Sequence, residues 1–240
     1  LLLSLAGLPL MGGCEMSPNG EFRLNGIDTA ASHFPDSGLR ALARAAAAGR
    51  ADEVRQLIQR GTDPNGQGKD TMTPLMWAVF ARNAAGVQAL LEGGAKAQMP
   101  ITVTRSSGAS FRVYPVEMAA RYCLPQIMES LLQHGADPET KDGGANTVLV
   151  EASHCFACFK LLVDHGADVN REIDGVAGNT ATAHGSANRH YDTVLYALQH
   201  GYRINLDELN YDIETGGVAD HLLPLRAEIL ALLKTKGVKP

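Results

Sequence analysis

The chain has 240 residues, of which 45% are hydrophobic and 20% charged, a balance that allows one or two globular domains with a buried core. Aromatic residues make up only 5%, so Ala and Leu must supply most of that core. The net charge of −5 argues against a nucleic-acid partner, which would need a basic face. No internal apolar run reaches the length that spans a bilayer.

Residues 1–13 are mostly apolar and end in two glycines, a pattern typical of a secretory signal peptide. They lack an initiator Met and a basic start, so we expect a truncated leader. The run Leu-Met-Gly-Gly-Cys at 10–14 resembles the lipobox of bacterial lipoproteins, with Met11 where Leu is usual. The resemblance implies that Cys14 is lipidated in the periplasm, and Glu15 favours the outer membrane. The alternative is an ordinary signal peptide followed by an unmodified cysteine.

Residues 15–38 show no helical periodicity. We expect either a flexible linker with a reach of about 27 Å, or an N-terminal cap on the first repeat. The side chains that would pack in such a cap are Phe22, Leu24, Ile27 and Phe34.

From residue 39 onward, apolar residues recur at helical spacing in pairs of short stripes. The first pair covers 39–47 and 54–58 and ends at Gly61, in the position that tolerates a left-handed backbone. The second begins with Thr-Pro-Leu at 73–75, where Thr can cap a helix and Pro suits its first position. It ends at Gly94, 33 residues after Gly61. Each pair therefore predicts a helix–turn–helix unit.

The same step returns at Tyr114, Thr147 and Thr180, and a period near 33 marks a stacked repeat array. Thr-Pro-Leu-Met-Trp-Ala at 73–78 resembles the ankyrin consensus Thr-Pro-Leu-His-x-Ala, with Met in place of His. We therefore expect an all-α ankyrin-repeat solenoid over 39–238, with five repeats and a degenerate C-terminal cap. In the fifth repeat, His-Gly-Ser at 184–186 should distort the first helix.

The step from Pro74 to Pro115 is eight residues longer than the period, and the excess lies in 99–112. A long insertion in a compact array is usually functional or disordered. β-branched and aromatic residues on either side of a Ser-Ser-Gly turn allow a hairpin of 101–104 with 110–113. We expect this insertion to contribute to a partner contact.

The ankyrin resemblance implies protein binding through the loop tips and first helices of a concave face. Trp, Tyr and Arg are enriched at interface hot spots, although Trp77 has an equally strong interpretation as a core residue. The predicted contact residues are Lys69, Asp70, Met72, Trp77, Phe80, Arg105, Phe111, Arg112, Arg121, Tyr122, Asp142, Asn146, Asp174 and Asn179.

In the ankyrin alignment, Cys123 and Cys155 occupy the turns of adjacent repeats, which stack as neighbours. An exported chain can form disulfides, so we predict a Cys123–Cys155 disulfide and a buried free thiol at Cys158. Cys155 and Cys158 also have the spacing of a redox motif, but they lie at a turn between helices and not after a strand.

His134, His165 and His200 each precede a closing Gly, where a His interacts well with the last carbonyls of a helix. Lying about one repeat apart, they are too distant to share one tetrahedral zinc. The sequence carries no nucleophile elbow and no phosphate loop. We therefore expect no catalytic site, no cofactor and no metal.

The Ala-rich first pair, the Trp after Thr-Pro-Leu and the lipobox together resemble the immunity proteins of antibacterial type VI secretion phospholipase effectors. The resemblance implies a periplasmic, lipid-anchored protein that occludes a secreted lipase toxin in a one-to-one complex. One alternative is a periplasmic ankyrin protein that supports an exported catalase or another housekeeping partner. An alternative of another class is a redox or metal enzyme that uses Cys155 and Cys158.

Overall fold

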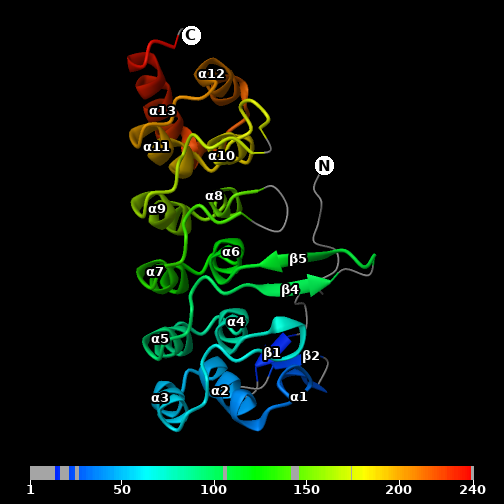
Figure 1. Cartoon of the computed structure of the whole chain (residues 1–240). Helices are drawn as coiled ribbons and strands as arrows, with labels where there is room; N and C mark the ends of the chain where they lie inside the picture. Colours follow the sequence, from blue (N-terminus) through cyan, green and yellow to red (C-terminus); the bar gives the residue numbers. More distant parts are fainter. Residues whose placement is uncertain are drawn as a thin grey trace. The chain divides into compact units, whose positions relative to one another are not determined.

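The computed structural model describes residues 14–16, 22–24, 27–104, 107–141, 146–173 and 175–238 (Figure 1). Two compact units make up the chain: residues 1–118 with 129–136, and residues 119–128 with 137–240. In the described part of the chain, no helix is both long and apolar enough to cross a membrane. The predicted leader at 1–13 lies outside the described residues.

Three short strands open the described chain: β1 (Cys14–Met16), β2 (Phe22–Leu24) and β3 (Ile27–Asp28). They pair antiparallel in the order β1-β2-β3, and α1 (Thr29–His33) follows them. Phe34, one of the residues expected in an N-terminal cap, is fully buried directly after α1.

The first unit contains two complete helix pairs, α2 (Ser37–Ala47) with α3 (Ala51–Gln59) and α4 (Pro74–Phe80) with α5 (Ala84–Glu92). Figure 1 shows α2 beside α4 and α3 beside α5. The predicted cap at Thr73 is confirmed, because its Oγ1 accepts the Met76 amide at 3.1 Å. Helices α2 and α5 approach so closely that they need small residues where they meet, because a Cβ on Gly86 would collide with the backbone of Ala46.

The insertion forms a hairpin, as its sequence predicts. Strand β4 (Ile101–Thr104) pairs antiparallel with β5 (Ser110–Val113), with Ile101 opposite Val113 and Thr104 opposite Ser110. Ile101 and Val113 are buried, whereas Thr104 and Ser110 are exposed. The hairpin is therefore anchored at its base and solvated towards its turn.

The remaining helices continue the paired pattern. In the second unit, α8 lies beside α10 and α9 beside α11, while α11 packs on α13. The described chain thus holds five helix pairs and a sixth pair in place of the expected cap, which confirms the all-α repeat architecture. The bounds are α6 (Pro115–Arg121), α7 (Pro125–Gln133), α8 (Val148–Glu151), α9 (Phe156–Asp164), α10 (Ala181–Ala187), α11 (Tyr191–Gln199), α12 (Leu206–Thr215) and α13 (Leu223–Thr235).

The expected distortion of the fifth repeat is wrong. Helix α10 runs unbroken through 184–186. Thr180 caps it by accepting the Ala183 amide at 3.2 Å, and Gly185 is buried against Thr193 and Val194. Packing against α11 thus outweighs the poor helix propensity of Gly. The shortest first helix is instead α8, with four residues.

The structural interpretation of the three repeated histidines is confirmed. The Nδ1 atoms of His134, His165 and His200 each donate a 2.8 Å hydrogen bond to the carbonyl four residues earlier. Each ring therefore adds a second hydrogen bond to a carbonyl in the last turn of its helix that also accepts the backbone amide of the same histidine.

Candidate functional site

The predicted contact residues divide by exposure. Lys69, Asp70 and Arg112 are exposed. Arg105, Asp142 and Asp174 lie outside the described residues. The half-buried members of the set are Phe80, Phe111, Arg121, Tyr122, Asn146 and Asn179.

Met72 and Trp77 do not belong to the exposed surface, and their assignment as contact residues is corrected here. Met72 is 7% and Trp77 5% exposed. The Trp77 ring meets Phe34 edge-on at 5.8 Å and lies 5.4 Å from the ring of His33. The last residue of α1 and the residue after it thus cover Trp77, and the core interpretation of this residue is the correct one.

The loop tip before α4 has an unusual backbone conformation that hydrogen bonds hold in place. Its 3-10 turn η1 (Lys69–Thr71) holds Asp70 and Thr71 at φ values of 55° and 57°. Such values are costly for a β-branched residue and persist only where neighbours hold the backbone. Here Thr71 Oγ1 accepts the Thr102 amide of β4 at 2.7 Å, and the Gly68 amide donates to the Met72 carbonyl at 2.8 Å. The tip and the hairpin are therefore locked to each other.

Pairing in the hairpin separates its side chains by face. Thr102 lies opposite Arg112, and Val103 opposite Phe111. Because side chains alternate along a strand, Val103 and Phe111 share the face of the buried base, whereas Arg112 points from the other face. The exposed charges of Lys69, Asp70 and Arg112 therefore stand on one braced substructure of the first unit, which we call the tip–hairpin surface (Lys69–Thr71, 101–104 and 107–113).

In the second unit, the predicted contact residues Arg121 and Asn179 bond to other side chains of the repeats. Arg121 forms a 3.1 Å ion pair with Glu151, and both side chains are 19% exposed. Asn179 Oδ1 lies 3.0 Å from Nε2 of His184. The sequence did not identify Glu151 and His184 as partners, because each lies in another helix or loop. These residues stabilise the repeat array, and they are weaker candidates for contact than the tip–hairpin surface.

Polar side chains also link the loops of successive repeats. Asn170 Nδ2 donates to the Gly201 carbonyl at 3.1 Å, and its Oδ1 accepts the Arg203 amide at 2.9 Å. Glu139 makes a related contact, accepting the Asp168 amide at 2.6 Å. Asn65 repeats the two-ended arrangement in the first unit. Stacking between repeats thus explains the Asp- and Asn-rich loops.

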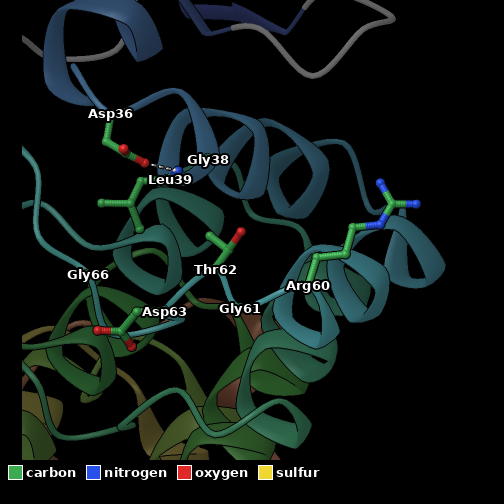
Figure 2. A pocket seen from close by; sticks show the side chains of 8 residues that line it. All are labelled: Asp36, Gly38, Leu39, Arg60, Gly61, Thr62, Asp63 and Gly66. Atoms are coloured by element: carbon green, nitrogen blue, oxygen red, sulfur yellow. Dashed lines mark hydrogen bonds between the residues drawn. The ribbon is translucent and has the colours of Figure 1, made fainter.

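A groove of about 350 Å³ lies at the first repeat (Figure 2). Its two carboxylates already act in local turns, since Asp36 accepts the Leu39 amide at 2.8 Å and Asp63 accepts the Asn65 amide at 2.9 Å. Figure 2 shows the Arg60 guanidinium directed away from both. The groove therefore offers no paired acid and base. It is lined by Asp36, Gly38, Leu39, Arg60, Gly61, Thr62, Asp63 and Gly66.

The structure joins Cys123 and Cys155 in a disulfide with a Cα–Cα distance of 5.5 Å. Cys158 is a buried free thiol whose Sγ lies 3.8 Å from the Ala119 carbonyl. The three Sγ atoms all lie within 4.8 Å of one another. Burial raises the pKa of Cys158 to about 11. Sequence reasoning placed Cys158 in the core and missed its proximity to the disulfide.

An exposed cluster on α9 and α11 was not anticipated. Lys160 Nζ lies 2.5 Å from Asp164 Oδ2 and 3.2 Å from the Tyr196 hydroxyl, and Tyr196 also donates to Asp164. The hydrogen bond from Lys160 is the main cause that lowers the pKa of Asp164. His200 stacks on Tyr196 at 3.8 Å. The sequence does place Lys160 four residues before Asp164, and Tyr196 four residues before His200. The contact between these two pairs depends on the packing of α9 against α11.

Most of the chain matches a known protein family. Residues 19–100 and 116–208 match the family model described as Ankyrin repeats (3 copies). That match covers well over half of the chain and agrees with the helix pairs and stacking loops described above. Repeats of this family act generally as protein-binding scaffolds and not as enzymes, so a protein partner is the expected ligand. The chain belongs to the ankyrin-repeat family.

Proposed function

We propose that this ankyrin-repeat scaffold is a periplasmic, lipid-anchored immunity protein. It binds an antibacterial type VI secretion phospholipase effector in a one-to-one complex and occludes it. The observation that carries the binding role is the tip–hairpin surface, where exposed charges stand on a backbone braced by the Thr102–Thr71 hydrogen bond.

A braced surface suits tight binding. Ordering loops and side chains on association costs free energy, and a surface that is already fixed avoids much of that cost. Lys69, Asp70 and Arg112 present both signs of charge, which favours one orientation of a complementary partner and penalises others. Half-buried Phe111 on the opposite face of β5 supplies apolar area close to these charges.

The proposed anchor follows from the resemblance of residues 10–14 to a lipobox. A tether raises the local concentration of an inhibitor at the surface on which a phospholipase acts. The toxin would then meet its inhibitor before it reaches lipid. The anchor and the binding surface are separate claims that can be tested with separate variants.

The test is protection of a sensitive cell that exports the product of the adjacent gene, which the proposal expects to be a phospholipase. We expect the complete protein to restore growth, Lys69→Glu with Arg112→Glu to lose protection, and Cys14→Ser to weaken it by releasing the protein from the membrane. Gln59→Ala, an exposed change on α3, is the matched control. Equal killing with and without the protein refutes the proposal, and a catalase gene in place of the lipase gene favours a housekeeping partner.

A further inference from the structure

Three cysteines from two successive repeats meet at one point of the second unit. Cys123 lies in the turn between α6 and α7, and Cys155 and Cys158 lie at the start of α9. Their Sγ atoms lie within 4.8 Å of one another. Thiolates bound to one zinc at Zn–S distances of about 2.3 Å stand roughly 3.8 Å apart at tetrahedral angles, so only small adjustments separate this cluster from a metal site.

The spacing on α9 matches that of thiolate metal sites. Cys155 is the N-cap residue and Cys158 the third residue of the helix, and Cys-x-x-Cys falls within the pair spacing typical of structural zinc sites. In the oxidised form the Cys155 side chain accepts no capping hydrogen bond. A thiolate at this position gains the first-turn amides and the positive end of the helix dipole, which favour negative charge.

The third cysteine leaves one side of the cluster open. Cys123 is exposed, whereas Cys155 and Cys158 are buried. It occupies a left-handed turn with φ 51°. Because Cys123 is exposed, a metal held here would be reached from solvent, and water would complete its coordination as in zinc sites with three protein ligands.

We propose that reduction of the Cys123–Cys155 disulfide converts this cluster into a three-thiolate site for a thiophilic divalent cation, with zinc as the best match. Three thiolates and Zn²⁺ leave a net charge of −1, opposite in sign to the start of α9. The disulfide and the metal site are mutually exclusive states of the same sulfur atoms. This inference concerns the redox state of the scaffold and does not depend on the identity of its protein partner.

The chemistry balances in two steps. A dithiol gives two electrons and two protons to the Cys123–Cys155 disulfide, which becomes two thiols while the dithiol becomes a disulfide. The three thiols then release three protons to solvent as the cation binds, because the thiolate is the ligand. Metal binding should therefore strengthen as pH rises through the neutral range.

Cobalt(II) provides the test, because it takes the place of zinc and reports thiolate ligation by charge-transfer absorption. The protein is the complete chain with Cys14→Ser, reduced by an immobilised dithiol. We expect one Co²⁺ per chain with a thiolate charge-transfer band, displacement by Zn²⁺, and no binding to the oxidised protein. Cys158→Ala, which leaves the other two cysteines in place, should lower the affinity by more than the tenfold to hundredfold typical of losing an outer-shell partner.

Two outcomes would overturn the proposal. One is equal cobalt binding by the Cys158→Ala protein and the parent; the other is a reduced parent that shows no charge-transfer band. If Cys158→Ala unfolds, as judged by circular dichroism, Cys123→Ser replaces it, because Cys123 is exposed and its loss leaves the core intact. Unchanged affinity in that variant is equally decisive against a three-thiolate site.

Discussion

The carboxamide of Asn65 joins two successive repeats of the first unit through both of its ends. Nδ2 donates to the Gly94 carbonyl at 2.9 Å, and Oδ1 accepts the Lys96 amide at 2.8 Å. Asn170 makes the same pair of bonds to Gly201 and Arg203 in the second unit. An Asn that appears in the sequence as an ordinary polar loop residue thus fixes the position of the next repeat.

Removing either carboxamide should loosen the array. We expect Asn65→Ala to lower the free energy of unfolding by about 1–3 kcal/mol, since two hydrogen bonds worth about 0.5–1.5 kcal/mol each are lost. Urea denaturation measures the change. Gln59→Ala on exposed α3 is the control and should stay within about 0.5 kcal/mol of the parent. An Asn65→Ala protein as stable as the control would show that the clamp contributes nothing.

Trp77 should behave as a core residue. Trp77 is 5% exposed and packs edge-on against Phe34. We therefore expect Trp77→Ala to lower the free energy of unfolding by about 3–5 kcal/mol, and Trp77→Phe to lower it by less. Guanidinium denaturation followed by circular dichroism checks both. Normal stability combined with loss of partner binding would instead restore the interpretation of Trp77 as a contact residue.

The repeat period was readable from the sequence because its signals are local. Thr73 caps its helix and Gly61 adopts φ 95° for reasons that each segment carries within itself. Trp77 was ambiguous because what covers it, Phe34, lies 43 residues away and belongs to no repeat. The regular helix at Gly185 was missed for a similar reason, since α11 supplies the packing that its own sequence lacks.

The disulfide should be a measurable part of stability. Its 32-residue separation corresponds to about 4 kcal/mol by the loop-entropy relation, so Cys123→Ser should lower the free energy of unfolding by up to that amount. Peptide mapping without reductant should recover the peptides of Cys123 and Cys155 joined. Recovery of both cysteines alkylated in the folded, untreated protein would exclude the bond.

Cys158 should resist alkylation in the native state. Burial raises its pKa to about 11 from an ordinary value of 9.0, so only about one molecule in a thousand carries the thiolate at pH 8, and the thiolate is the nucleophile. We expect slow reaction with iodoacetamide until denaturant is added. Mass spectrometry of tryptic peptides follows it, and rapid native labelling would contradict the buried position.

The raised pKa of Cys158 should also make the stability of the protein depend on pH. A group with a raised pKa in the folded state holds its stabilising contribution below its unfolded pKa and loses it as pH rises towards the folded value. The contribution of Cys158 should therefore be intact below pH 9.0 and fall between 9.0 and about 11. Cys158→Ala should flatten this part of the stability profile, and an unchanged slope would contradict the assignment.

Charge reversal on the tip–hairpin surface should weaken the partner complex without harming the fold. Lys69 and Arg112 are exposed, so Lys69→Glu with Arg112→Glu should leave urea stability within about 0.5 kcal/mol. The dissociation constant should rise about tenfold or more, with most of the loss disappearing at high salt. Isothermal titration at two salt concentrations measures both effects, and an unchanged constant would move the contact to another surface.

The central claim, that this scaffold occludes a phospholipase toxin, is tested most directly by purifying the product of the adjacent gene, which the proposal expects to be a phospholipase, and titrating it with this protein. Hydrolysis of phospholipid vesicles is followed as the ankyrin protein is added. The account predicts that activity falls in proportion to added protein and disappears at one equivalent. Full hydrolysis in the presence of excess folded protein would contradict it.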